Sequence, residues 1–324
     1  MTEQHAEVRE AGKPADWERN LLEKVLLAGI AEQRRARRWG IAFKLVMLGY
    51  LGITLWLVAA PFDARTGGGS GRHTAVVDVV GTIVDGGDTN ATSVIEGLRD
   101  AAKDKGTKGI ILRMNSPGGS PVQSSYVWQD IRRLKQERPD LPVYAVVSDL
   151  CASGCYYVAS AADKIYVNPS SVVGSIGVIM PGFGFVEALG KLGVERRVLT
   201  AGEHKALLDP FSPVSEAEKL HIQQNVLNAI HQQFIAAVRQ GRGDRLKESP
   251  ELFSGLVWTG DEGIKLGLAD GLGDVQAVAK TVIGADKIVN FTPRQRWLER
   301  ISQRVGTSLA QGVLGAVSAG LDLR

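Results

Sequence analysis

The sequence predicts an α/β fold with a largely parallel sheet, preceded by one transmembrane helix. From residue 74 onward, short apolar runs alternate with longer runs whose apolar residues recur at helical spacing. This alternation is typical of parallel strands joined by crossover helices. Upstream, residues 41–60 form an apolar stretch with a single charge, Lys44. About 20 apolar residues are what a helix needs to cross a bilayer.

Composition bounds the kind of protein without identifying it. The chain has 324 residues, of which 44% are hydrophobic and 23% charged, as expected for one or two globular domains. The net charge of +3 gives no reason to expect a nucleic-acid partner. Much of the excess lies in one short arginine cluster: Arg34, Arg35, Arg37 and Arg38.

The arginine cluster also predicts the orientation of the span. It lies directly before residues 41–60, and Trp39 and Trp56 stand near the two ends as interfacial anchors. The positive-inside rule then places residues 1–40 in the cytoplasm as a tail, and residues 61–324 on the outer side of the cytoplasmic membrane. A cleaved signal peptide is the first alternative, but its leader is unusually long and no A-x-A site follows the apolar run. A buried core helix is the second.

The region beyond the span divides into three parts. Residues 61–73 have the composition of a flexible linker, residues 74–290 form the main domain, and residues 291–324 are a weakly amphipathic segment. That last segment is expected to contact either a partner subunit or the membrane surface. Apolar patterning predicts strands at 75–84, 108–114, 142–147, 164–167, 172–180 and 194–199. The same criterion predicts helices at 89–105, 122–138, 153–162 and 215–239, and a short helix followed by a turn within 260–273.

The two cysteines are Cys151 and Cys155. If both are helical, their separation of one turn is poorly suited to a disulfide, and two thiols alone make a poor metal site. We therefore expect small buried packing residues.

Two motifs point to acyl-transfer chemistry. Asn115–Gly119 places adjacent glycines at the end of an apolar strand, and Ser153 stands at the turn from a strand into an apolar helix. Backbone N–H groups at such turns can hold an oxyanion, and a serine beside them is a candidate nucleophile. The alternative reading of Ser153 is a helix N-cap without a catalytic role.

A serine nucleophile needs a base. A histidine base would most plausibly be His204 or His221, although no local signature supports either one. Lys205 is the other candidate, since a lysine acts as a base only when burial lowers its pKa, and Leu207 and Leu208 lie close by. By spacing alone, the sequence favours a solvated loop residue at Lys205 over a buried base.

Four segments together resemble the signal peptide peptidase A family of serine–lysine membrane peptidases, in its short form. The first two segments also occur in related Clp protease and crotonase-type folds, whereas the Gly-Ser-Ile-Gly-Val motif and the downstream lysine are specific. The resemblance covers about residues 74–280 and implies a Clp protease/crotonase-like fold, a repeated β-β-α superhelix. The four segments are Asn115–Gly119, Ala152–Lys164, Val173–Met180 and Ala201–Lys205.

The resemblance assigns roles to individual residues. It implies Ser153 as nucleophile, Lys205 as general base, and Ser175 as the residue that positions the lysine amine. Ser175 is otherwise a strand or turn residue. Cys155 departs from the family pattern, which has a glycine there. The oxyanion hole is implied to consist of Gly118 or Gly119 together with the N–H of Ser153 or Gly154.

The resemblance also implies partners and substrates. Serine and lysine of one active site come from neighbouring subunits of a homo-oligomer at the membrane. The substrates are hydrophobic peptides such as cleaved signal peptides, and no metal or cofactor takes part. The Ser-Pro-Gly-Gly segment is not a phosphate loop, because the G-x-x-x-x-G-K pattern is absent.

Two rival functions remain at this point. A crotonase-like acyl-thioester enzyme uses paired backbone amides but no serine nucleophile, so the apolar anchor, Ser153 and Lys205 argue against it. A catalytically silent oligomeric membrane scaffold predicts that Ser153→Ala has no effect, and a Lys205 that is fully exposed in the assembled oligomer would favour it.

Overall fold

The computed structural model describes residues 16–59 and 71–293. The chain splits into two compact units, one ending at Thr66 and the other beginning at Gly67, and each is described by itself. Residues 294–324 of the C-terminal segment predicted at 291–324 lie outside the described residues. Residues 61–70 of the linker predicted at 61–73 do so as well.

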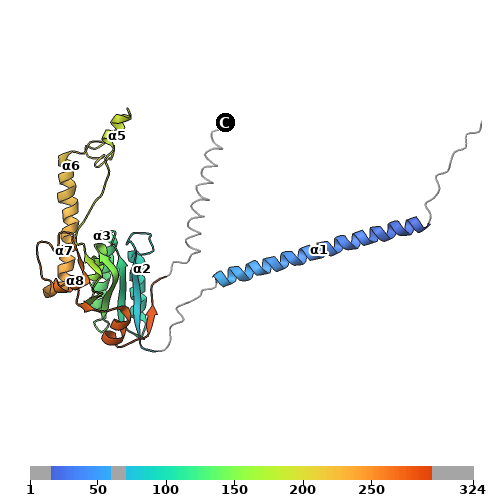
Figure 1. Cartoon of the computed structure of the whole chain (residues 1–324), viewed down its shortest axis with the longest axis horizontal. Coiled ribbons are helices and arrows are strands. Elements are labelled where there is room, and N and C mark those ends of the chain that lie inside the picture. The colour runs from blue at the N-terminus through green and yellow to red at the C-terminus, as the bar shows by residue number, and fades with distance from the viewer. Residues whose placement is uncertain (1–15, 60–70, 294–324) are drawn as a thin grey trace, which may run out of the picture. The chain divides into compact units, whose positions relative to one another are not determined.

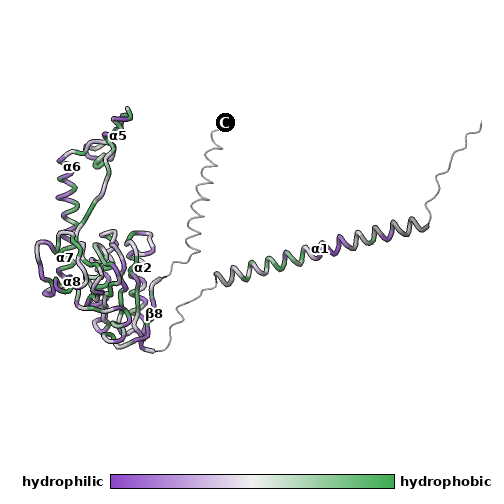
Figure 2. Tube along the Cα trace, viewed as in Figure 1, coloured by the Kyte–Doolittle hydropathy of each residue, from purple (hydrophilic) through white to green (hydrophobic). Residues whose placement is uncertain are grey.

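The first unit contains one long helix, α1 (Asp16–Ala59). Figure 2 shows that α1 changes from hydrophilic near its middle to hydrophobic further along the chain. Across the described part of the chain, no helix meets the combined length and apolarity of a membrane span. The span predicted at 41–60 falls on α1, but residue 60 and the side chains of residues 55–59 are outside the description.

The second unit is built on an eight-stranded sheet in the order β6-β5-β3-β2-β1-β8, with β4 and β7 attached beside β3. The central strand β3 pairs with β2 along one side, whereas its other side is shared by β4 near its start and β5 near its end. Every pairing is parallel except β5 with β6. The strands are β1 (His73–Val80), β2 (Thr107–Ser116), β3 (Val143–Ala152), β4 (Lys164–Val167), β5 (Val172–Gly174), β6 (Val257–Thr259), β7 (Gly271–Leu272) and β8 (Ile288–Asn290).

Helices cover both faces of this sheet. The larger core lies under α2 (Ala91–Lys103), α3 (Pro121–Glu137) and α4 (Gly154–Ala159), which Figure 1 shows against the sheet. On the other face, the short α9 (Val275–Ala277) and the π-helix η4 (Val278–Ile283) cover a smaller core. Adjacent strand residues alternate between the two cores, as the period of a strand requires. For example, Val77 and Leu112 join the larger core, and Val76 and Ile111 the smaller.

The predicted helices of this unit are confirmed, and local sequence explains where they begin. Asn90 caps α2 by accepting a hydrogen bond from the Ser93 N–H. Ser120 caps α3 in the same way, and Pro121 occupies the first helical position, where its missing N–H costs nothing. The apolar stripe predicted for α3 is buried: Val127, Ile131 and Leu134 are at most 7% exposed.

Between β5 and the end of the helix at 242, the chain forms an arm that extends away from the sheet (Figure 1). We use "the arm" for residues 177–227. It contains α5 (Val186–Lys191), α6 (Glu216–His221) and the π-helix η2 (Ile222–Leu227), which continues into α7 (Asn228–Arg242). The helix predicted at 215–239 is therefore confirmed. Ser215 begins it with a capping box.

A buried ion pair, with a more exposed one beside it, anchors the base of the arm to the sheet. Arg242 at the end of α7 is 1% exposed and donates to Asp270 Oδ2 at 2.7 Å and to the Gly267 carbonyl at 2.9 Å. Arg245, in the 3₁₀ turn η3 (Gly243–Arg245), lies 3.3 Å from the other carboxylate oxygen. Asp270 Oδ2 also accepts from the Ile165 N–H of β4. Since α7 carries the arm, this network sets its direction.

Two strand predictions were wrong. Residues 194–199 lie on the arm with exposed side chains, and the structure gives them no strand partner, so no strand forms there. The strand predicted at 172–180 ends at Gly174, because Ser175 adopts a positive φ that no continuing strand allows. The residues 260–273 contain α8 (Gly260–Lys265) followed by a turn, as expected.

Candidate active site

Three neighbouring parallel strands end at one edge of the sheet, and the predicted site residues follow these ends. In the register of β2 with β3, Ser116 lies opposite Cys151. In the register of β3 with β5, Ala152 lies opposite Gly174. Paired strands are about 4.8 Å apart, so the segments that follow meet in space. The carboxyl edge of a parallel sheet is where such folds bind ligands.

The Asn-Ser-Pro-Gly-Gly motif ties the end of β2 to the end of β3. Asn115 Nδ2 donates to Asp149 Oδ2 at 2.9 Å, and its Oδ1 accepts from the Leu150 N–H at 3.2 Å. The buried Ser116 Oγ accepts from the Gly118 N–H at 3.1 Å. The first two residues of the motif therefore hold its glycines in place.

Positions 118 and 119 require glycine for two reasons: both have a positive φ, and neighbouring backbone leaves no room for a Cβ. Their φ angles are +96° and +149°. A Cβ at Gly118 would lie 2.6 Å from the Gly154 nitrogen and 2.9 Å from the Ser153 Cβ. A Cβ at Gly119 would collide with the Ile83 carbonyl. Only glycine lets this loop approach the turn that carries Ser153.

Ser153 is held in an unusual backbone conformation between β3 and α4. Its φ is 54° and its ψ −124°, outside the ordinary regions for a residue with a side chain. Its side chain makes no capping hydrogen bond. Ser120, by contrast, has a φ of −60° and caps α3 with its side chain. Ser153 occupies a cap position without acting as a cap, and such strain is found mostly at functional sites.

The backbone amides around Ser153 separate into occupied and available donors. The Ser153 N–H donates to the Gly174 carbonyl at 2.9 Å, and the Gly118 N–H to Ser116. The N–H groups of Gly119 and Gly154 take part in neither bond, and a Cβ at Gly154 would lie 3.2 Å from the Gly119 nitrogen. Of the predicted combinations, Gly119 with Gly154 is the one in which neither N–H takes part in these two bonds, so this pair is the candidate for an oxyanion hole.

Ser175 is placed beside Ser153 by strand register. Each of the two serines follows one member of the Ala152–Gly174 pair. Ser175 also has a positive φ, of 52°, and its N–H donates to the Leu256 carbonyl at 2.7 Å. Among the described residues, Leu208 is the one further non-glycine residue with a positive φ.

Lys205 is not brought to this edge within one chain. It lies on the arm between α5 and α6, and Figure 1 shows that segment at the end of the arm away from the sheet. Its side chain is exposed, and its N–H donates to the Gly202 carbonyl. Lys205 and Ser153 belong to one active site only if a second chain brings its arm to this one.

The described histidines have their contacts elsewhere. His204 lies 4.0 Å from Glu218 on the arm, and His221 contacts Asn225 within its own helix. His73 contacts Thr107 at the opposite end of the sheet. His231 lies closer to the site, with its Nε2 3.1 Å from the Ile176 carbonyl, one residue beyond Ser175.

The prediction of two unpaired cysteines was wrong: Cys151 and Cys155 form a disulfide. The prediction assumed that both are helical. Cys151 instead lies on β3 and Cys155 on α4, and the turn at Ser153 brings their Cα atoms to 5.1 Å. That separation is within the range that a disulfide spans. Both residues are fully buried, as expected.

Ser124 is a site residue that sequence reasoning missed. It is fully buried on α3, and its Oγ donates to the Ser120 carbonyl at 3.0 Å. A Cβ at Gly154 would lie 2.5 Å from this Oγ, so Ser124 sits directly against the Gly154 backbone. One serine among several at the start of a helix carries no signal that could have identified it.

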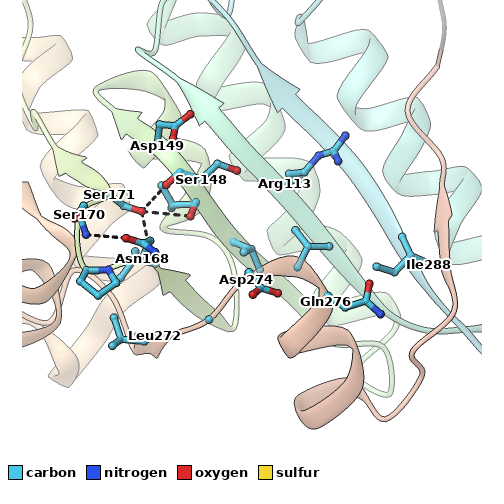
Figure 3. Close-up of a pocket in the computed structure, with 16 residues that line it drawn as sticks. Arg113, Ser148, Asp149, Asn168, Ser170, Ser171, Leu272, Asp274, Gln276 and Ile288 are labelled. Atoms are coloured by element: carbon cyan, nitrogen blue, oxygen red, sulfur yellow. Dashed lines mark hydrogen bonds between the residues drawn. The ribbon is translucent and has the colours of Figure 1, made fainter.

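A cavity with a volume of about 900 Å³ lies elsewhere in the second unit (Figure 3). It borders the face of the sheet opposite α3 and α4 and includes none of the predicted site residues. Its polar side chains hold its own walls: Ser171 Oγ accepts from the Asn168 N–H, and Asn168 Oδ1 from the Ser170 N–H. Arg113 pairs with Asp78 at 2.7 Å. We interpret this cavity as structural.

Comparison with known proteins places these features in a family. Residues 135–288 match the model of peptidase family S49. A protein of Brucella abortus named as a Na⁺/H⁺ antiporter is 43% identical over 66% of this chain, but the match covers 29% of that protein. A putative signal peptide peptidase of Enterococcus faecium is 31% identical over 64% of this chain and 61% of its own length.

Two further comparisons complete the picture. A putative protease of Synechocystis is 30% identical over 66% of this chain and 76% of its own length. A mutant of a membrane-bound stomatin-specific protease, solved with a substrate peptide, aligns with a TM-score of 0.41 at 17% identity, covering 64% of this chain and 79% of its own. The chain thus spans less than two thirds of the first relatives it matches. With the family model and the Synechocystis relative in agreement, the chain belongs to peptidase family S49, the signal peptide peptidase A family.

Proposed function

We propose that the protein is a membrane-anchored serine endopeptidase that uses Ser153 and Lys205 to hydrolyse hydrophobic peptides. The observation that carries the proposal is the conformation of Ser153. It is held at a positive φ, makes no cap bond, and lies beside the amides of Gly119 and Gly154. A serine held in this way at the carboxyl edge of a parallel sheet is suited to attack a carbonyl bound there.

The proposed reaction needs Ser153, the two amides and a Lys205 amine brought to them. Ser153 Oγ attacks the peptide carbonyl carbon and gives its proton to the neutral Lys205 amine. The N–H groups of Gly119 and Gly154 hold the oxyanion, which typically contributes about 10²–10³ in rate per donor. Lys205 passes the proton to the leaving amine, and water then hydrolyses the acyl-enzyme with Lys205 again as base.

The base is supplied by a neighbouring subunit in this proposal. A neutral lysine amine requires burial, and Lys205 is exposed in the single chain. The arm that carries it exposes apolar side chains, among them Phe183 at 82% and Leu199 at 100%. Exposed apolar surface of this kind usually marks an interface. A ring of head-to-tail contacts would place each arm against the next chain.

The membrane location is also proposed. Its support is the apolar stretch at 41–60 within α1, preceded by the arginine cluster, which gives a cytoplasmic N-terminus. The Cys151–Cys155 disulfide adds support, since disulfides persist mainly outside the reducing cytosol. An anchor of this kind keeps the site close to hydrophobic peptides, such as signal peptides left in the bilayer.

One observation favours a second candidate, the catalytically silent scaffold. Lys205, the proposed base, lies on the arm and is exposed in the single chain. If the chains assemble without bringing Lys205 to Ser153, the oligomer has no serine–lysine dyad.

A peptidase assay on the full-length protein in detergent micelles separates the two. We expect wild type to cleave a hydrophobic fluorogenic peptide and Ser153 to be labelled by a fluorophosphonate. Ser153→Ala and Lys205→Ala should each lose about 10³-fold or more in kcat/KM. Lys219→Ala, which removes an exposed lysine of α6 on the same arm, should keep full activity.

Two other outcomes would show whether the choice of base or the peptidase proposal itself is wrong. If Lys205→Ala stays active while Ser153→Ala does not, Lys205 is not the base, and the next variants are His231→Ala, at the histidine that lies closer to the site, and His204→Ala. If wild type cleaves none of a broad set of peptides and Ser153 resists labelling, the scaffold is correct and the peptidase proposal fails.

A further inference from the structure

The Cys151–Cys155 disulfide brackets the proposed nucleophile. The bond closes a loop whose interior residues are Ala152, Ser153 and Gly154. Ala152 pairs with Gly174, and Ser153 has the positive φ. The N–H of Gly154 is a candidate oxyanion donor. No other covalent link occurs among the described residues, since the two cysteines are the only ones in the chain.

The bond joins two elements that are each fixed in the core. Cys151 lies between Ser116 of β2 and Val173 of β5 in the sheet register. Cys155 is the second residue of α4 and is fully buried. Behind it, Tyr156 donates its hydroxyl to the Leu268 carbonyl at 2.8 Å. The two ends of the loop are thus tied to the sheet and to the helix layer.

This geometry opposes relaxation of Ser153. A return of its φ to a negative value would change the direction in which α4 leaves the end of β3, and would move Cys155 relative to Cys151. The disulfide links these two residues at a Cα separation of 5.1 Å, and it tolerates only a narrow range of Cα separations and Cβ directions. The cross-link therefore restricts changes of the turn, and with them changes in the direction of Ser153 Oγ and of the Gly154 N–H.

We propose that Cys151 and Cys155 are positioning residues, and that their disulfide keeps the Ser153 turn in its catalytic conformation. The proposal rests on the peptidase function above. Forming the bond removes one hydrogen from each thiol, and a partner disulfide takes up the two electrons and two protons and becomes a dithiol. Because both sulfur-bearing residues are fully buried, a dithiol reductant does not reach the bond in the folded protein.

The first readout is the redox state of the purified full-length chain, and it is independent of activity. Denatured without reductant and treated with iodoacetamide, the chain should gain no alkyl group by intact mass. After reduction it should gain two. Uptake of two groups without prior reduction would show free thiols and overturn the proposal.

The second readout compares kinetics. Cys151→Ala/Cys155→Ala should lower kcat by about tenfold or more and leave KM within about twofold, because a small displacement of reacting groups costs rate rather than binding. Ile110→Val, a buried change on β2 away from the loop, is the control for lost stability, and should keep wild-type kcat. Wild type incubated with dithiothreitol without denaturant should keep its activity.

The possible outcomes distinguish failure of the positioning role from failure of the proposed peptidase function. An active wild type with a double variant of equal kcat contradicts the positioning role and leaves the peptidase intact. A double variant with lower kcat but the thermal midpoint of the Ile110→Val control supports it. An inactive wild type that resists fluorophosphonate contradicts the peptidase, and the positioning role fails with it.

Discussion

At the residue scale, the defining feature is that Ser153 stores backbone strain. A positive φ costs a side-chain-bearing residue about 1–3 kcal/mol, and the cost persists only where the surroundings impose the conformation. Here the Gly174 carbonyl, the glycine loop and the disulfide impose it. Ser175 at the end of the neighbouring strand has the same feature. Two adjacent strands therefore end in strained serines at one edge of the sheet.

The strain at Ser153 predicts that glycine is the more stable substitution there and alanine the less stable one, the reverse of the usual order. Ser153→Gly should raise the free energy of unfolding by about 1 kcal/mol relative to Ser153→Ala, because glycine adopts this φ freely and the relief exceeds its unfolded-state entropy. Thermal or chemical unfolding of the two variants measures the difference.

The matched control is a serine in an ordinary conformation. Ser125 lies inside α3, where Ser125→Gly should be less stable than Ser125→Ala by about 1 kcal/mol, the reverse order. If glycine is also the less stable substitution at position 153, the turn is not strained, and the argument from conformation to catalysis is lost.

At the element scale, the sequence predicted the helices and strands whose signals are local. The stripe of α3, the cap at Ser120 and the Pro121 start lie in one short segment, and the helix forms there. The strand at 164–167 matches β4. These elements agree with expectation because burial and capping act over a few neighbouring residues.

Elements that depend on distant partners were not predictable in this way. The strand β8 is three residues long and exists only by pairing with β1, more than 200 residues earlier. The segment 194–199 has an apolar pattern but no partner, so it remains irregular. For the site, spacing identified Ser153 and the glycines. The disulfide and the packing of Ser124 against Gly154 depend on a turn that only the folded chain shows.

The Arg242–Asp270 ion pair at the end of α7 predicts how the stability of the protein depends on pH. Burial raises the pKa of the Asp270 carboxyl, but the hydrogen bond and charge of Arg242 and the Ile165 N–H outweigh it, so the pKa lies below its ordinary value. A lowered folded-state pKa means that the stabilisation is complete above the unfolded-state pKa of about 4 and is lost as the pH falls through the folded-state value. Asp270→Asn should cost about 3 kcal/mol at pH 7, because it leaves Arg242 buried without its counterion.

Unfolding of wild type and Asp270→Asn between pH 7 and pH 3 tests this. The gap between their midpoints should be largest at neutral pH and should narrow below about pH 4. Asp140→Asn is the control, since Asp140 forms an exposed pair with Arg138, and its midpoint should follow wild type throughout. A gap independent of pH would show that the Asp270 charge does not stabilise the anchor.

At the scale of the whole molecule, the second unit separates the proposed nucleophile from the proposed base. Ser153 lies at the edge of the sheet, whereas Lys205 lies on the arm, which α7 and the Arg242–Asp270 pair hold away from the sheet. The arm also carries an aromatic cluster in which Phe185 stacks on Phe211 at 5.5 Å, with Phe183 beside it. Because these aromatic side chains are exposed, the arm is suited to dock on another copy of the chain.

A dyad shared between subunits has a consequence that an intramolecular dyad lacks. A Ser153→Ala subunit still offers Lys205, and a Lys205→Ala subunit still offers Ser153. Neither variant alone has a complete site. In an oligomer that contains both, some sites combine the intact serine of one chain with the intact lysine of the next.

The most direct test of the central claim is therefore the activity of mixed oligomers. The two full-length variants are co-expressed with different tags, purified through both tags in succession, and assayed on a hydrophobic peptide. With random order in a head-to-tail ring, about a quarter of the sites are complete, so activity should return to about a quarter of wild type while each variant alone stays inactive. Mixed oligomers as inactive as the single variants would contradict a Ser153–Lys205 site formed between subunits.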